Sequence, residues 1–131
     1  MIVADASALV EALIASTKAE KVAGALYGQQ VHAPDLIAFE ILSAIRRRVR
    51  GGRLTPAEAI AAMRAYEDVE HNLELWPLLE VMTERSVELR DNVSSYDATY
   101  VALAEILNCP LVTADARLAR AVEDLIEVIV V

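Results

Sequence analysis

Short runs of apolar, often β-branched residues alternate with longer alanine-rich segments along nearly the whole chain, and no other feature restricts the fold as much. The short runs fit buried strands, whereas the longer segments have the length and apolar spacing of helices. Parallel strands need helical crossovers of this length, and right-handed crossovers place helices on both faces of a sheet. The pattern therefore predicts an α/β fold, a three-layer α/β/α sandwich around a central parallel sheet of about five strands.

Local signals give the approximate bounds of these elements. The expected strands are Ile2–Ala4, Gln30–Ala33, Leu73–Trp76, Leu111–Thr113 and Glu127–Val131. The expected helices are Ser7–Tyr27 with a break near Ser16, Pro34–Arg50, Thr55–Val69, Leu78–Arg90, Ser95–Leu107 and Asp115–Val122. The clearest helix start is at Thr55, which is followed by Pro56 and by Glu58 at the capping-box position.

The length of 131 residues fits one domain, so we expect a single domain over residues 1–131. No apolar stretch approaches the roughly 20 residues that a membrane helix needs. Asp5 lies where a secretory signal would carry basic charge. These features indicate an unprocessed cytoplasmic protein that does not insert into a membrane. The lone cysteine, Cys109, cannot form an internal disulfide, and we expect it to pack as a buried side chain.

The charge is unevenly distributed. Twenty acids against twelve bases give a net charge of -8, which excludes a generally basic surface for nucleic acid. Five of the twelve bases nevertheless lie between Arg46 and Arg53. This arginine run fits a solvated helix end, whose bases favour the negative end of the helix dipole. It equally fits a local positive patch for RNA phosphates or for an acidic stretch of a protein partner.

Two of the expected strands end in an aspartate. Asp5 follows Ile2–Ala4, and Asp115 comes two residues after Leu111–Thr113. In a parallel sheet both emerge at the carboxyl edge, outside which such sheets carry their functional crevice. Two more acids are expected at this edge, Asp97 at the start of a helix and Glu40 in the helix after the second strand. Singly, the aspartates fit helix caps and Glu40 fits a solvated border position, but together they predict an acidic cluster.

A cluster of carboxylates needs protonation or a cation. Two carboxylates about 5 Å apart repel by roughly 3 kcal/mol at an effective dielectric constant of about 20. Oxygen ligands without histidine or cysteine favour Mg²⁺ or Mn²⁺ over zinc. Such ions typically act on phosphates, because they activate a bound water and stabilise charge on the leaving oxygen.

Four segments, spread in order over essentially the whole chain, carry a family resemblance: Val3–Leu9, Pro34–Glu40, Ser95–Ala104 and Leu111–Asp115. Together they resemble the PIN-domain family, and their order and the chain length are similar in particular to the VapC toxins of prokaryotic toxin–antitoxin pairs. The resemblance implies an endoribonuclease that depends on Mg²⁺ or Mn²⁺, acts on RNA, forms homodimers and is held inactive by a cognate VapB-type antitoxin.

The resemblance also assigns roles by position. The catalytic and metal-binding residues, here called the acid quartet, would be Asp5, Glu40, Asp97 and Asp115. Ser7 and Thr113 match small hydroxyl positions that support the quartet; their alternative roles are a helix cap and a strand-end residue. Arg117 follows Asp115 by two residues and would reach a substrate phosphate, unless it is plain surface charge.

Other functions fit the sequence less well. A phosphoryl-accepting domain needs a lysine beside its aspartate, but both lysines, Lys18 and Lys21, lie in an early helical segment. A metal-free ribonuclease would use His32 and His71, which nothing in the sequence brings together. A non-catalytic interaction module would use the acids only as caps. The products distinguish the enzymes, because a metal-activated water leaves 5′-phosphate and 3′-hydroxyl ends, whereas the histidine mechanism leaves cyclic 2′,3′-phosphates.

Overall fold

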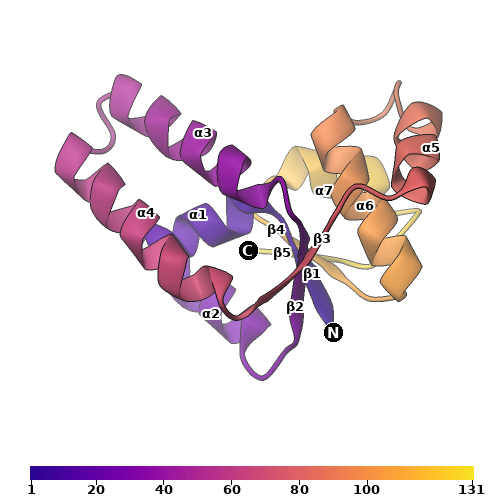
Figure 1. Cartoon of the computed structure of the whole chain (residues 1–131), viewed down its shortest axis with the longest axis horizontal. Helices are drawn as coiled ribbons and strands as arrows, with labels where there is room; N and C mark the ends of the chain where they lie inside the picture. The colour runs from indigo at the N-terminus through magenta and orange to yellow at the C-terminus, as the bar shows by residue number, and fades with distance from the viewer.

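Five short strands form one parallel sheet in the computed structural model, which describes the whole chain, Met1–Val131 (Figure 1). The strands are β1 (Ile2–Ala4), β2 (Val31–Pro34), β3 (Leu73–Trp76), β4 (Leu111–Thr113) and β5 (Val128–Val130). Their order across the sheet is β3-β2-β1-β4-β5, and every pairing is parallel. The predicted parallel sheet of five strands is confirmed, and β1 and β4, which precede Asp5 and Asp115, are neighbours at its centre.

Seven helices cover the two faces of the sheet. They are α1 (Ala6–Leu13), α2 (Ala19–Leu26), α3 (Ile37–Arg50), α4 (Pro56–Glu70), α5 (Glu80–Glu88), α6 (Ser95–Leu107) and α7 (Ala116–Val122). Figure 1 shows α1 to α4 on one side of the sheet and α5 to α7 on the other, which confirms the three-layer α/β/α architecture. No helix is long and apolar enough to cross a lipid bilayer.

The second strand ends later than the sequence indicates. Pro34, expected as the first residue of a helix, is instead the last residue of β2 and pairs with Trp76 of β3. The sheet pairing continues past Pro34 because the Asp35 backbone N–H donates to the Trp76 carbonyl oxygen at 2.8 Å. Helix α3 therefore begins at Ile37. The capping box at Thr55 and Glu58 forms as predicted.

Two helices are fixed firmly by burial, and both carry acids of the quartet. In α3, Ile37, Ile41 and Ile45 are at most 1% exposed, as their helical spacing predicts. In α6 every residue from Ala98 to Ala104 is buried, because this helix packs between the sheet and α5. Each large apolar side chain buried in this way contributes roughly 1.5–3 kcal/mol. Glu40 and Asp97 therefore project from parts of the fold that have little freedom to move.

Candidate active site

Asp5 and Asp115 lie at the carboxyl ends of neighbouring strands. β1 and β4 pair with Ala4 opposite Val112, and the Asp5 backbone N–H donates to the Val112 carbonyl oxygen at 3.0 Å. Each aspartate also accepts backbone hydrogen bonds from the first turn of the helix that follows it, Asp5 in α1 and Asp115 in α7. Both are therefore helix caps, and capping holds both carboxylates at one edge of the sheet.

Two hydroxyl groups hold the Asp5 carboxylate in place. The Ser7 hydroxyl donates to Asp5 Oδ1 at 2.7 Å, and the Thr113 hydroxyl donates to Asp5 Oδ2 at 2.5 Å. The hydroxyl oxygen of Ser7 also accepts a hydrogen bond from the Ala114 backbone N–H at 2.9 Å, and that of Thr113 accepts one from the Asp115 backbone N–H at 3.0 Å. Ser7 and Thr113 thus join the Asp5 carboxylate to the backbone that carries Asp115, in addition to their local roles.

Asp5 is almost completely buried, with 5% of its surface exposed. Burial raises its pKa above the ordinary value, and the negative charge of Asp97 adds to the rise. Hydrogen bonds from Thr113, the Ala8 backbone and Ser7 act in the opposite direction. The net rise means that the ionised carboxylate is costly in this position until a positive charge lies nearby.

Glu40 reaches the same place from α3, and its surroundings differ from those of Asp5. Its Oε1 atom is buried without a hydrogen-bond partner, and so is the hydroxyl of Tyr100 on α6. Burial, followed by the charges of Asp97 and Asp5, raises the pKa of Glu40 to about 7. The Tyr100 hydroxyl lies close enough to lower this pKa, but its position does not meet the distance and angle of a hydrogen bond to Glu40. An unpartnered buried carboxylate oxygen is uncommon and costly, and a bound cation would satisfy it.

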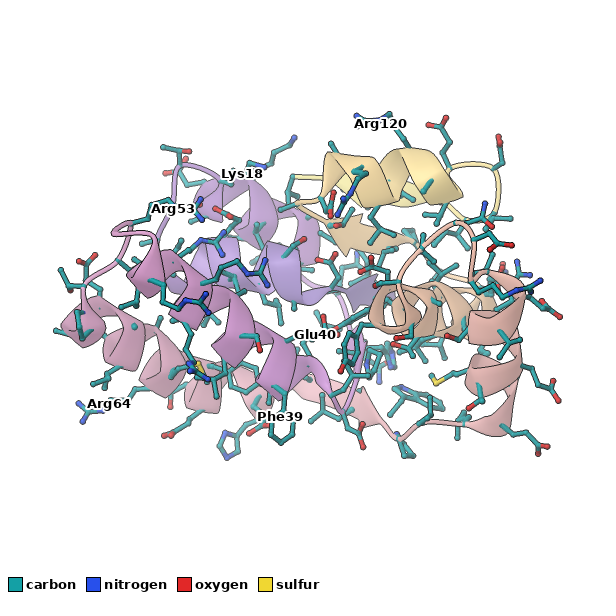
Figure 2. All side chains as sticks on the ribbon, turned by 90° about the horizontal axis from the view of Figure 1, so that it is seen from above. Lys18, Phe39, Glu40, Arg53, Arg64 and Arg120 are labelled. Atoms are coloured by element: carbon teal, nitrogen blue, oxygen red, sulfur yellow. The ribbon has the colours of Figure 1, made fainter.

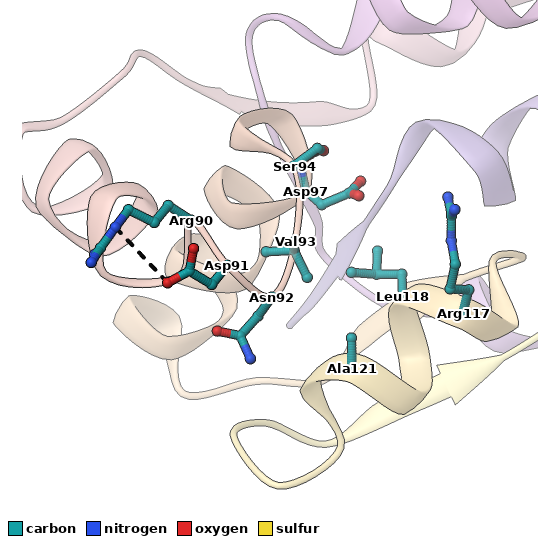
Figure 3. A pocket seen from close by; sticks show the side chains of 9 residues that line it. All are labelled: Arg90, Asp91, Asn92, Val93, Ser94, Asp97, Arg117, Leu118 and Ala121. Atoms are coloured by element: carbon teal, nitrogen blue, oxygen red, sulfur yellow. Dashed lines mark hydrogen bonds and ion pairs between the residues drawn. The ribbon is translucent and has the colours of Figure 1, made fainter.

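Asp97 lies in the first turn of α6, where its backbone N–H donates to the Ser94 hydroxyl at 3.1 Å. Burial and the charge of Asp115 raise its pKa, whereas the Ser94 hydrogen bond and the charge of Arg117 lower it. Arg117 Nη2 is 3.8 Å from Asp115 Oδ2. Figure 3 shows the side chains of Asp97 and Arg117 extending beside the same hollow, from α6 and α7. Arg117 therefore places positive charge near both of these acids.

A cavity of about 720 Å³ opens over the acids. Glu40, Asp97 and Asp115 line it directly, and Asp5 lies beneath Ser7, which also lines it. A second cavity of about 350 Å³ shares Ser94, Asp97 and Arg117 with the first (Figure 3). The structure thus places Glu40, Asp97, Asp115, Ser7 and Arg117 at one hollow at the carboxyl edge of the sheet. Asp5 and Thr113 are buried next to it, within hydrogen-bond distance of Ser7.

The residues in this hollow fit a divalent cation in chemical type. All side-chain donors at the acid quartet are oxygen atoms, and the buried Glu40 Oε1 lacks a partner. Charges of neighbouring quartet members help to raise the pKa values of Asp5, Glu40 and Asp97. No three of the His, Cys, Asp and Glu side chains already lie close enough to hold one ion together. Binding would therefore need the carboxylates to turn toward the centre of the cavity.

The arginine run divides between two surfaces. Arg47 and Arg48 line the acidic cavity, and Arg48 forms an ion pair with Glu11 at 2.6 Å. Arg46 and Arg50 instead border an apolar groove between α3 and α4. The arginines of this run therefore lie on two different surfaces, and neither a solvated helix end nor a single positive patch describes all of them.

Three aromatic residues at the site were not identified from the sequence. Tyr100 lies one helical turn after Asp97, a spacing that would have placed it on the same face of α6. Phe39 and Tyr96 line the cavity, although they are 75% and 59% exposed. Each directly precedes an acid of the quartet in the sequence, but no periodicity reveals that such a side chain stays exposed.

The residues required by the alternative mechanisms are not brought together. His32 is buried in β2, where its Nδ1 accepts a hydrogen bond from Trp76 Nε1 at 3.0 Å. His71 lies exposed at the end of α4. Lys18 and Lys21 belong to the start of α2 and do not line the acidic cavity.

Comparison with known proteins agrees with the family resemblance of the sequence motifs. The model of the PIN domain matches residues 2–124. The VapC ribonuclease Mb0985 of Mycobacterium bovis is 41% identical over 119 residues, which cover 91% of this chain and 89% of that protein. Ribonuclease VapC12 of Mycobacterium tuberculosis is 38% identical over 120 residues, 92% of this chain and 91% of that protein.

Solved structures share the fold. A toxin–antitoxin complex from Klebsiella pneumoniae superposes with a TM-score of 0.72 at 14% identity, covering 98% of this chain and 96% of that chain. The Mycobacterium tuberculosis toxin VapC20, described as cleaving the sarcin–ricin loop, superposes with a TM-score of 0.67 at 18% identity, covering 92% and 95%. At these identities the likeness concerns the fold alone.

Proposed function

Since this chain belongs to the PIN-domain family, we propose that it is a toxin endoribonuclease of the VapC type, which hydrolyses RNA phosphodiester bonds. We further propose that it requires Mg²⁺ or Mn²⁺, forms a homodimer and is restrained by a cognate VapB-type antitoxin. The antitoxin partner is proposed because the curated relatives are ribonucleases of the VapC type.

The observation that carries the proposal is that Glu40, Asp97 and Asp115 line one cavity, with Asp5 hydrogen-bonded to the lining residue Ser7 and a buried Glu40 oxygen without a partner. A non-catalytic module that used its acids as caps would not explain Glu40, because Glu40 caps no helix. A phosphoryl-accepting site would need a lysine at the cavity, and none lines it. These two alternatives therefore lack support.

The residues at the cavity would have different roles in the reaction. The acid quartet would hold the cation, which when bound supplies an activated water and stabilises charge on the phosphate. Ser7 and Thr113 fix the orientation of Asp5. Arg117 lies at the cavity beside Asp115 and binds a substrate phosphate. Because water attacks, rather than the ribose 2′-hydroxyl, the products carry 5′-phosphate and 3′-hydroxyl ends.

The test is to express the protein with the product of its neighbouring gene, separate the two, and map the cut ends in total RNA. We expect cleavage only with added Mg²⁺ or Mn²⁺, and 5′-phosphate ends. Asp97→Asn should abolish cleavage and leave the fold intact, whereas Asp68→Asn, on the exposed surface of α4, should change neither. Cyclic 2′,3′-phosphate ends, or full turnover after exhaustive chelation, would contradict the proposal.

A further inference from the structure

Two aromatic side chains stand exposed at the rim of the acidic cavity. Phe39 is the only phenylalanine in the chain and is 75% exposed, and Tyr96 is 59% exposed. Both line the cavity that is also lined by Glu40, Asp97 and Asp115. Single exposed apolar residues are ordinary, but two exposed aromatic rings at one polar cavity are not explained by packing.

The two rings come from opposite layers of the fold. Phe39 belongs to α3 and Tyr96 to α6, and the sheet lies between the layers that contain these helices (Figure 1). Figure 2 shows Phe39 projecting from the outer side of α3, with Glu40 next to it and closer to the centre of the molecule. Tyr96 directly precedes Asp97 in α6. Because both rings line the cavity but come from different layers, they approach it from two sides.

Positively charged side chains line the same cavity as the rings. Arg47, Arg48 and Arg117 line the same cavity, so cations for backbone phosphates and aromatic faces for bases occur together. Sites for single-stranded nucleic acid combine these two elements, because every base offers a face for stacking. Bases inside a duplex are already stacked on one another and cannot be reached in this way.

We propose that Phe39 and Tyr96 are stacking platforms for two nucleobases of the bound RNA, one on each side of the cavity. The proposal rests on the proposed ribonuclease function and adds to it two substrate-binding residues. The nucleotide strand crosses the cavity with its bases against the rings and its phosphates toward the acids and arginines.

The test measures binding of a short fluorescein-labelled RNA of randomised sequence in the presence of chelator, which prevents cleavage. A matched strand of equal length with abasic positions through its middle keeps the phosphates and lacks the bases. We expect Phe39→Leu and Tyr96→Leu each to weaken RNA binding about tenfold, because a stacked base is worth about that much. Binding of the abasic strand should stay unchanged. Phe39→Trp should retain the affinity of the unmodified protein.

The matched control is Tyr27→Leu, which removes an 89% exposed aromatic ring that lines none of the cavities described above. A loss no larger than that of the control, or an equal loss for the abasic strand, would overturn the proposal. So would a selective loss of antitoxin binding with RNA binding unchanged, since the rings would then be a protein contact. Failure of the ribonuclease function is separate: it would leave this binding pattern present but no cleavage with Mg²⁺ or Mn²⁺.

Discussion

The acid quartet has two parts that differ in how well their polar atoms are satisfied. Asp5 is held by the hydroxyls of Ser7 and Thr113 and by the Ala8 backbone N–H. Glu40 is buried to a lesser degree, yet its Oε1 has no partner, and the Tyr100 hydroxyl nearby has none either. The pKa of both carboxyls is raised, with burial as the main cause.

This difference separates what the fold needs from what the proposed reaction needs. The Asp5 side of the site is part of the structure, because its hydrogen bonds join β1, α1 and β4. The Glu40 side is left unsatisfied by the protein, so its polar atoms are free for a ligand. Substitutions on the two sides should therefore affect stability differently even where they affect activity alike.

The largest effects on cleavage are expected for Asp5→Ala and Glu40→Ala, and a comparison of the two variants tests the difference between the two sides. Both should reduce RNA cleavage by at least about 100-fold, since each removes a proposed metal ligand. Asp5→Ala should also lower the free energy of unfolding by about 1–2 kcal/mol, because it removes the cap of α1 and the acceptor of two hydroxyls. Glu40→Ala should leave stability unchanged or raise it. Urea unfolding in chelator and a cleavage assay measure the two quantities.

Asp68→Ala, on the exposed surface of α4, serves as the control and should change neither quantity. Equal losses of stability for Asp5→Ala and Glu40→Ala would show that Glu40 has hydrogen-bond partners in the folded protein. The distinction between a satisfied and an unsatisfied side of the site would then be wrong.

The next effect is on pH dependence. The pKa of Glu40 rises from an ordinary 4.5 to about 7 on folding, so between these values the folded state binds more protons than the unfolded state. Stability should then fall as pH rises from about 4.5 to about 7, and stay low above it, by at most about 3 kcal/mol. Asp5 and Asp97 act in the same direction. Urea unfolding at a series of pH values in chelator measures the slope.

Glu40→Gln should flatten this slope, because glutamine does not titrate. Adding Mn²⁺ at pH 8 should recover stability in the unmodified protein, since the ion favours the charged carboxylate. A slope that is the same in Glu40→Gln would assign the pH dependence to other groups.

A smaller effect is expected when only the hydrogen bonds around Asp5 are changed. Thr113→Val keeps the shape of a fully buried side chain but removes the donor to Asp5 and the acceptor for the Asp115 N–H. We expect a loss of about 1–3 kcal/mol in stability and a fall of roughly tenfold in cleavage. Thr99→Val is the matched control, because Thr99 is also buried but its hydroxyl donates only to the Tyr96 carbonyl oxygen. A smaller loss in the control is expected, and equal losses would contradict the role of the Asp5 network.

The two sides of the site also differ in how far the sequence predicts them. Asp5 and Asp115 were located from strand ends and helix caps, which are local signals. The bounds of α6 and β4 follow from the same kind of signal and match the prediction. Pro34 was misassigned, because its place in β2 depends on β3, which lies far along the chain.

The unsatisfied side depends on packing between α3 and α6. A helical wheel places Glu40 at the border of an apolar face but cannot show that its Oε1 is buried without a partner. Whether Glu40 Oε1 has a hydrogen-bond partner depends on how the side chains of α6 pack against those of α3. For the same reason, the sequence did not show that Tyr100 faces Glu40.

The smallest expected effect tests this missed residue. Tyr100→Phe removes a buried hydroxyl that has no hydrogen-bond partner, so stability in chelator should stay unchanged or rise by up to about 1 kcal/mol. Tyr66→Phe is the matched control, because its hydroxyl donates to Glu70 Oε1 at 3.3 Å, and it should lose about 0.5–1 kcal/mol. Urea unfolding of both variants measures the difference in sign. If Tyr100→Phe lost as much stability as Tyr66→Phe, the Tyr100 hydroxyl would have a partner in solution, and the Glu40 side of the site would be as satisfied as the Asp5 side.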